Sequence, residues 1–208
     1  MLIMFTAGQL GNQIFQYGFI ESIKENKEKI ITSKCEYFDI FEYEKKNYLF
    51  LNKYNRFILR RILNFFSKIR LISSIKQTKE IMNNYTVNSD NFIEKKGLLA
   101  FIKIVDGFYQ SSKFIKSIPK IKTSYIQDAN QYLSDIPEEM QKVFVHIRRG
   151  DYLEWSVLGK KNPSLPLSYY KTAITNIQNN LNNPLFIFLS NDTEYVKKEF
   201  NYIKNKKI

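Results

Sequence analysis

Residues 143–147, VFVHI, and residues 185–189, LFIFL, are short apolar runs that end in polar sequences, RRGD at 148–151 and SND at 190–192. Between them, residues 167–181 carry apolar side chains at helical spacing. Strands that alternate with helices in this way are typical of a parallel α/β sheet. Ligands of such sheets bind where loops leave the carboxyl ends of the strands. We therefore expect RRGD and SND to lie together at a ligand site.

The N-terminal residues predict another strand, loop and helix. An apolar run at 2–6 meets AGQLGNQ, and apolar side chains then recur at helical spacing up to Ile23. We expect the helix to begin near Asn12, a residue type suited to capping, after a tight loop that Gly8 and Gly11 permit. Such a loop presents backbone N–H groups at a helix start, where phosphate groups bind readily.

The segment 53–83 combines aliphatic side chains with many Lys and Arg residues. Its spacing gives a broad apolar helical face, which we interpret as a pair of core-facing helices with solvated lysines. Docking of this basic amphipathic segment on an anionic membrane surface is the alternative. Residues 98–105 are expected to form a buried strand, followed by a turn at Asp106-Gly107 and then a helix.

Two Ile-Pro pairs, at 118–119 and 136–137, bracket a stretch that we interpret as one helix and a linker. The linker residues 135–141 are the best candidate for a domain boundary. The sequence therefore predicts an α/β chain with a first domain at 1–140 and a second at 141–208.

The composition is that of a globular protein. Hydrophobic residues make up 44% of the 208 residues and aromatic residues 15%, with only 7 Gly and 5 Pro, which excludes disordered and collagen-like classes. The single cysteine, Cys35, excludes an intrachain disulfide and a cysteine zinc cluster. No apolar run approaches the ~18 residues of a membrane span, and no basic region precedes the first one. We therefore expect a cytoplasmic protein, with peripheral membrane contact left open.

The formal net charge of +12 raises the question of nucleic-acid or membrane-surface binding. The Lys residues are spread along the whole chain, and the aromatic residues lie in apolar periodic segments where core packing explains them. We therefore expect no nucleic-acid partner.

Arg148 and Arg149 carry the main chemical signal. Arginine's planar fork of donors suits phosphate oxygens. Alternation along the strand places His146 and Arg148 on one face and Arg149 on the other, so we expect one arginine to bind ligand and the other to be structural. Ion pairs with acids such as Asp151 are the alternative. His146, the only histidine, is a conceivable general base, but a packed, hydrogen-bonded role is favoured.

No Asp-x-Asp sequence occurs, so no divalent-metal clamp on a diphosphate is signalled. A diphosphate would instead be neutralised by Arg148 and by the loop at 8–12.

Four ordered blocks carry a family resemblance: AGQLGNQIFQYGF, GFYQSSKF, VHIRRGDYL and FLSNDTEYVKKEF. Together they resemble the glycosyltransferases of family eleven, the bacterial and animal α-1,2-fucosyltransferases. The resemblance implies a GT-B-like fold of two Rossmann-like domains, an acceptor-side domain and a nucleotide-sugar domain. It implies inverting, metal-independent transfer of L-fucose from GDP-β-L-fucose to a hydroxyl of a galactose-terminated glycan, as in lipopolysaccharide synthesis, with no cofactor.

The resemblance also implies the site residues. The catalytic pair is Arg148, on the donor diphosphate, and Asp151. The implied substrate-binding residues are, in chain order, Gly8, Gly11, Asn12, His146, Arg149, Ser190 and Asp192. An arginine at the diphosphate would stabilise charge on departing GDP. Asp151, Asp106 and Glu21 all remain candidates for the general base.

The chain departs from the family pattern in two respects. It has Asn191 and Tyr195 where the family commonly has an aspartate and a tryptophan. A further C-terminal block of the Asn-Ser-x-Phe-Ser-Trp-Trp kind does not follow. Residues 141–208 therefore suffice for about two βα units, and we expect an incomplete second domain whose last strand exposes an unpaired edge and an uncovered apolar face. A truncated, non-catalytic remnant is the corresponding alternative function.

Overall fold

The computed structural model describes residues 1–82, 84–116, 119–157 and 159–208. The chain divides into two compact units, Met1–Ala129 and Asn130–Ile208, and each is described by itself. The division falls within helix α4 (Thr123–Leu133), before the boundary expected at 135–141. Leu133, Ile136 and Met140 pack into a core of the second unit, which is why the end of this helix and the following linker belong to it. The start of the predicted helix and linker, at Ile118, lies outside the described residues.

The N-terminal unit is built on a six-stranded sheet with the order β3-β2-β1-β6-β4-β5. All neighbouring strands are parallel except β4 and β5, which are antiparallel. The strands are β1 (Leu2–Met4), β2 (Ile30–Ser33), β3 (Tyr48–Leu51), β4 (Ile72–Met82), β5 (Tyr85–Lys95) and β6 (Leu99–Asp106). The helices are α1 (Leu10–Ile23), α2 (Glu36–Ile40) and α3 (Lys53–Lys68), with 3-10 turns η1 (Lys45–Asn47) and η2 (Ser112–Phe114).

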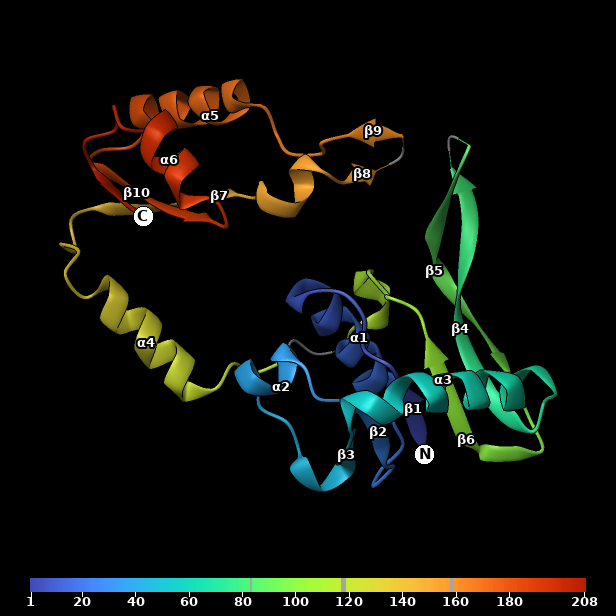
Figure 1. Ribbon diagram of the computed structural model, residues 1–208. Coiled ribbons are helices and arrows are strands. Elements are labelled where there is room, and N and C mark those ends of the chain that lie inside the picture. The colour runs from blue at the N-terminus through green and yellow to red at the C-terminus, as the bar shows by residue number, and fades with distance from the viewer. Residues whose placement is uncertain (83, 117–118, 158) are drawn as a thin grey trace. The chain divides into compact units, whose positions relative to one another are not determined.

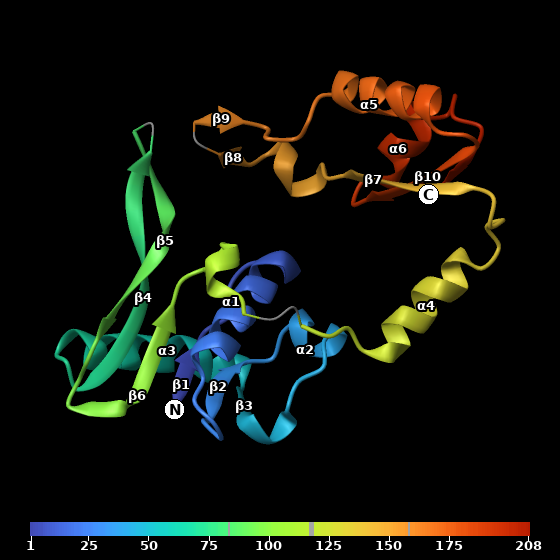
Figure 2. The same ribbon diagram turned by 180° about the vertical axis from the view of Figure 1, so that it is seen from behind.

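The N-terminal unit has three layers, because successive side chains of β1 point to opposite faces of the sheet and helices pack on both faces. Leu2 and Met4 pack with α1 and α2 in one core, whereas Ile3 packs with Leu63 of α3 in another. Helices α1 and α3 therefore cover opposite faces of the sheet (Figures 1 and 2). This places the carboxyl ends of β1 and β6 between the two helical layers, where an α/β sheet binds its ligands.

The segment 53–83 is not a pair of helices. Its first half is α3, as expected, but Ile72–Met82 is the strand β4. The sequence signal misled because Ile72 and Ile75 have helical spacing. In the strand they point to opposite faces of the sheet, and both are buried, Ile72 in the core beneath α3 and Ile75 in the core beneath α1. Pairing with β6 on one side and β5 on the other decides the conformation, and both partners are distant in sequence. The predicted strand at 98–105 and the turn at Asp106-Gly107 are confirmed, but the strand is buried only at Ile104 and Val105, whereas Phe101 is 65% exposed. The helix expected after them is only the short turn η2.

The loop before α1 differs in detail from the expectation. The helix begins at Leu10 with Gln9 at the N-cap position, so Asn12 is not a cap. Gly8 has φ +79°, a left-handed conformation that favours glycine. Gly11 is an ordinary helical residue, since a Cβ there would meet open space. The tight turn thus depends on one of the two glycines.

Cys35 lies half-buried beside a hydroxyl cluster inside the N-terminal unit. Tyr17 bonds to Thr6 and Thr32 at 2.5 and 2.8 Å between oxygens, and the Cys35 thiol donates to the Tyr17 oxygen at 3.7 Å. Burial raises the pKa values of both Tyr17 and Cys35 above their ordinary range. Both side chains are therefore held in their neutral forms.

The C-terminal unit has a three-stranded parallel sheet with the order β11-β10-β7. Its elements are β7 (Gln141–Ile147), η3 (Gly150–Leu153), β8 (Ser156–Val157), β9 (Lys160–Lys161), α5 (Leu167–Asn180), β10 (Pro184–Ser190), α6 (Thr193–Glu199) and β11 (Lys206–Lys207). Strands β8 and β9 form a small antiparallel hairpin. The predicted strands at 143–147 and 185–189 and the helix between them are therefore confirmed.

The two faces of this small sheet differ in cover. One face packs against α5 and α6 through Tyr170, Ile174 and Val196. On the other face, the α4 end and linker cover Leu185 and Ile187, whereas Phe144 and Leu189 are exposed. The expected uncovered apolar face is therefore present only in part, at Phe144 and Leu189. The strand predicted last, β10, has no unpaired edge, since β7 and β11 lie on its two sides. The edges of the sheet are β7 and β11, so the last described strand, β11, does have an unpaired edge.

Within the described part of the chain, no helix combines the length and apolar character needed to cross a membrane.

Candidate functional site

The ends of β7 and β10 bring RRGD and SND together, as the sequence predicts. These strands are parallel neighbours, with Ile147 opposite Ser190 at their carboxyl ends. The Arg149 backbone N–H donates to Oδ1 of Asn191 at 2.9 Å, and Arg149 Nε donates to Oδ2 of Asp192 at 3.2 Å. The two loops are therefore bonded to each other directly.

Asp151 holds the Arg148 side chain in place. Two guanidinium nitrogens, Nη2 and Nε, donate to the two carboxylate oxygens at 2.7 and 3.3 Å, which is a forked pair. The guanidinium also lies over the Tyr152 ring, with Cζ 4.4 Å from the centroid. The side chain is 32% exposed, so its remaining donors can still meet a ligand. Arg148 is thus fixed in orientation and accessible.

The pairing holds both groups in their charged forms. The hydrogen bond from Arg148 lowers the pKa of Asp151 below its ordinary value, and the same bond raises the pKa of Arg148. A carboxylate with a lowered pKa is a weak proton acceptor. Asp151 is therefore suited to orienting Arg148 and poorly suited to acting as the general base.

Arg149 has a different set of partners. Its guanidinium lies over the Tyr195 ring at 3.7 Å and pairs with Asp192. Asp192 in turn caps helix α6, because its Oδ1 accepts from the Tyr195 backbone N–H at 3.1 Å. Ser190 accepts a hydrogen bond at its Oγ from the Asp192 backbone N–H at 3.0 Å. Arg149, Ser190 and Asp192 are thus bonded to one another between the two loops. Both arginines form the ion pairs that the alternative interpretation expects, and the expected roles of Arg149, Ser190 and Asp192 in substrate binding stay predictions.

Gly150 and Asn191 are in close contact where the two loops meet. A Cβ on Gly150 would lie 2.4 Å from the Asn191 side-chain nitrogen, closer than carbon and nitrogen approach without displacement. The sequence alone does not indicate this packing partner. Asn191, noted in the sequence as a lost carboxylate, keeps an oxygen acceptor for the Arg149 N–H.

His146 does not have the packed role that the sequence favours. It lies in the edge strand β7 and is exposed, on the face that also bears Phe144. A packed role would need a layer over this face, which the described residues do not supply at this position. Its expected role in substrate binding stays a prediction.

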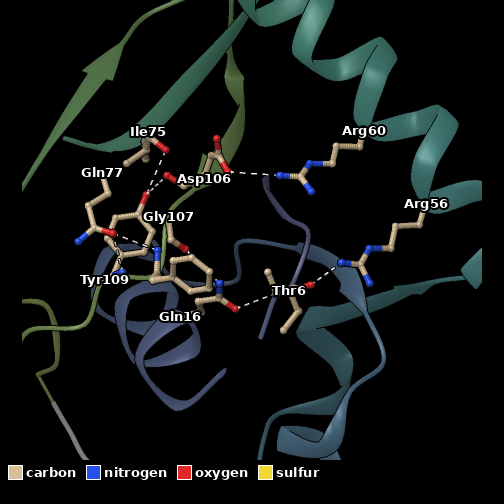
Figure 3. A network of polar contacts seen from close by, with 11 residues as sticks. Thr6, Gln16, Arg56, Arg60, Ile75, Gln77, Asp106, Gly107 and Tyr109 are labelled. Carbon is tan, nitrogen blue, oxygen red and sulfur yellow. Dashed lines mark hydrogen bonds and ion pairs between the residues drawn. The ribbon is translucent and has the colours of Figure 1, made fainter. Parts of the chain in front are cut away.

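The carboxyl edge of the N-terminal sheet carries a second polar cluster (Figure 3). Arg56 and Arg60 reach it from α3: Arg56 Nη2 donates to the Thr6 carbonyl at 2.5 Å, and Arg60 lies 3.7 Å from an Asp106 carboxylate oxygen. Gln16 joins this cluster from α1 by donating to the Gly107 carbonyl at 3.1 Å. Arg56 and Arg60 belong to no motif that the sequence shows. Their placement on the sheet-facing side of an amphipathic helix is the signal that could have indicated them.

The Gly8 loop lies in the same unit. The Gln13 side chain donates to the Gly8 carbonyl at 3.1 Å, and Asn12 Oδ1 accepts from Gln110 at 2.5 Å. A Cβ on Gly8 would collide with Asn12, which would lie 2.1 Å away. Asn12 therefore fastens the loop to residues after β6 instead of capping α1.

The three candidate bases differ in availability. Glu21 accepts from Tyr48 Oη at 2.5 Å and from Lys24 at 2.6 Å, near the end of α1 away from the Gly8 loop. Asp151 is committed to Arg148. Asp106 is about half exposed at the carboxyl end of β6 and has the long contact with Arg60. Of the three carboxylates, that of Asp106 therefore has the weakest polar contact.

Among the residues that the structure describes, no three His, Cys, Asp or Glu side chains gather into a group that could hold a metal ion.

Comparison with known proteins gives a family match and two similar relatives. Residues 98–208 match the family described as Glycosyl transferase family 11. The chain is 30% identical over 225 aligned residues to an Escherichia coli alpha-1,2-colitosyltransferase, covering 95% of this chain and 71% of that protein. It is 22% identical to the E. coli O-antigen biosynthesis glycosyltransferase WbnK, covering 93% of this chain and 74% of that one.

A solved structure shares the fold. The crystal structure of the alpha-1,6-fucosyltransferase NodZ, soaked with GDP-fucose, aligns with a TM-score of 0.51 and 10% sequence identity, covering 99% of this chain and 76% of NodZ. The fold is therefore of the GT-B-like α/β kind that the sequence predicts. The family match spans more than half of the chain, and it includes both the Arg148 and the Asp192 loops. The chain belongs to glycosyl transferase family 11.

Proposed function

We propose that this chain transfers L-fucose from GDP-β-L-fucose to a galactoside hydroxyl, forming an α-1,2 linkage with inversion at the anomeric carbon and without a metal. The observation that carries the proposal is Arg148, held in a fork by Asp151 at the carboxyl end of β7. A fixed, accessible guanidinium is suited to a diphosphate. We place the reaction on the cytoplasmic side, in the synthesis of a surface glycan such as lipopolysaccharide.

The chemistry follows from where charge develops. Breaking the bond between fucose C1 and the phosphate oxygen leaves positive character on the sugar and added negative charge on GDP. A preorganised cation at the diphosphate stabilises that charge more in the transition state than in the ground state. Arg148 supplies it, Asp151 keeps it aimed, and Arg149 with Asp192 keeps the supporting loops in place.

Asp106 is our candidate for the base that takes the acceptor proton. It is about half exposed at the carboxyl end of β6, where α/β sheets tend to bind ligands, and its one carboxylate contact among the described residues is longer than those of Glu21 and Asp151. The expected roles of Gly8, Gly11, Asn12, Ser190 and Asp192 around the donor belong to the same proposal.

Titration calorimetry with GDP and with GDP-fucose tests the Arg148 assignment. We expect Arg148→Ala to weaken binding about tenfold or more, since it removes charge-assisted hydrogen bonds. Lys204→Ala, which removes the same charge at an exposed position of the same unit, should bind as the parent chain does. Equal binding by Arg148→Ala and the parent would overturn the assignment. Donor binding without turnover on galactosides would instead identify a non-catalytic chain.

A colitosyl donor is the second candidate, because one relative is a colitosyltransferase at 30% identity. Colitose is L-fucose without its C3 hydroxyl group. A site that hydrogen-bonds this hydroxyl rejects the deoxy donor strongly, whereas an apolar pocket does not. Turnover of GDP-fucose and GDP-colitose measured side by side decides between them, and faster turnover of GDP-colitose would replace fucose in the proposal.

A further inference from the structure

Helix α3 presents two apolar stripes. The inward stripe, with Leu63 at its centre, covers the sheet. The outward stripe consists of Ile58, Ile62 and Phe65, continued by Ile69 just after the helix, and all four side chains are exposed, between 44% and 62%. Nothing among the described residues of the N-terminal unit covers this outward stripe. Exposed apolar side chains that lie next to one another are typical of an interaction surface.

The sequence around α3 contains many basic residues and no acidic ones. Between Glu44 and Glu80 the sequence contains ten Lys and Arg residues and neither Asp nor Glu. On the helix, Arg61 and Lys68 flank the outward stripe. A helix with an apolar face bordered by cations, and without acids, matches an anionic bilayer in both respects.

A cationic cavity lies at the C-terminal end of this helix. Its volume is about 450 Å³, and four of its lining side chains are Lys68, Arg70, Lys76 and Lys95. Its described lining includes no carboxylate, and these four cations form no ion pair with any described residue. Ile69 of the outward stripe stands between two of them in sequence. The cavity is therefore suited to an anionic headgroup, at the end of a stripe suited to acyl chains.

Arg70 is held there at a conformational cost. Helix α3 ends in a Schellman motif, in which the Leu71 N–H donates to the Phe66 carbonyl at 2.9 Å and the Arg70 N–H to the Ser67 carbonyl at 3.2 Å. Arg70 occupies the left-handed position with φ +56°, where glycine is favoured. Glycine would complete this turn with less strain, so the turn itself does not require arginine.

We propose that the outward stripe of α3 and the adjoining cationic cavity dock the protein on an anionic membrane surface, with the isoleucines and Phe65 in the interface and a lipid phosphate in the cavity. Nucleic acid fits less well, because three of the four exposed stripe residues are isoleucines, which do not stack on bases. This inference is independent of the donor proposed above.

Vesicle sedimentation tests the proposal with the full chain. Vesicles of phosphatidylcholine are compared with vesicles that also contain phosphatidylglycerol, at low and high salt. We expect binding only to the anionic vesicles, weakened by salt. Lys68→Glu should lower the affinity at least about fivefold, and Phe65→Ser about tenfold or more. Arg70→Gly should lower vesicle affinity about fivefold without lowering thermal stability, which separates lipid binding from folding.

Two matched control variants distinguish binding through this surface from effects of net charge or of exposed apolar side chains elsewhere. Lys204→Glu makes the same charge change in the other unit, and Ile81→Ser removes an apolar side chain that is 81% exposed on β4. Both should bind vesicles as the parent does. Equal binding to both vesicle types, or equal losses in the controls, would overturn the proposal. So would tighter binding to a uridine oligonucleotide than to the vesicles, or pyrophosphate binding in the cavity without vesicle binding.

Discussion

Arg148 and Arg149 are adjacent in sequence but are held by different partners. Arg148 is forked onto Asp151 and accessible, whereas Arg149 is stacked on Tyr195 and paired with the residue that caps α6. Strand alternation predicts that the two arginines differ, but it does not predict which of them is structural. That distinction depends on Asp192 and Tyr195, which reach the site only through the parallel pairing of β7 and β10.

The Asp151 carboxyl should titrate below its ordinary pKa of 3.8. Because the folded pKa is lowered, the Arg148 pairing is fully present above the unfolded value and is lost as the pH falls through the folded value. An NMR pH titration of the Asp151 side-chain carbon measures this. We expect Arg148→Ala to raise the Asp151 pKa toward its ordinary value, and an unchanged midpoint in that variant would contradict the pairing. Between pH 5 and 8, Asp151 should stay ionised, so it adds no pH dependence to donor binding in this range.

At the scale of elements, α3 is the layer that covers its face of the N-terminal sheet over β4 and β6. Its inward and outward side chains should therefore respond differently to truncation, although they are equally apolar. The comparison separates core packing from surface binding on one helix.

Leu63→Ala should lower the free energy of unfolding by about 2–4 kcal/mol, because it opens a cavity against Ile3 and Ile104. Ile62→Ala, at a position 44% exposed, should cost less than about 1 kcal/mol. Urea denaturation followed by circular dichroism measures both. Similar losses in the two variants would mean that the outward stripe is packed in solution.

The elements also show where sequence prediction succeeds and fails. Strands β1 and β10 were predictable because each contains a continuous apolar run, which a buried parallel strand requires. Strand β7 was predictable from its β-branched and aromatic residues at 143–145, although it is a largely exposed edge strand. Strand β4 was not, since Ile72 and Ile75 have helical spacing and are both buried only because the two faces of the sheet are covered. Strand β5, with Asn88, Asp90 and Asn91 within it, has poor local strand propensity, and antiparallel pairing with β4 makes it a strand. The Arg148 loop was predictable from motif and alternation, whereas the contributions of Arg56 and Arg60 required knowledge of which side of α3 meets the sheet.

At the scale of the whole molecule, the chain has separate cores in its two units. Leu2, Met4 and Tyr17 belong to one, and Phe186, Val196 and Phe200 to the other. Each core is closed by helices of its own unit. Cooperative unfolding follows shared packing, so we expect the units to unfold as distinct transitions.

Scanning calorimetry should resolve two transitions. Leu63→Ala should lower the Tm of one of them, and Ile174→Ala, at a position only 2% exposed in the C-terminal unit, should lower the other. A loss of 2 kcal/mol corresponds to a shift of roughly 10 °C in a unit of this size. A single transition that moves equally in both variants would show that the units fold as one.

Cys35 gives the N-terminal unit an intrinsic label. It is the only thiol in the chain, it is half-buried beside Tyr17, and burial raises its pKa, so little of the reactive thiolate is present at neutral pH in the closed state. Opening of this unit exposes the thiol and returns its pKa toward the ordinary value. The rate at which Cys35 is alkylated therefore measures how fast the N-terminal unit opens. No engineered probe or tag is needed to distinguish this unit from the other.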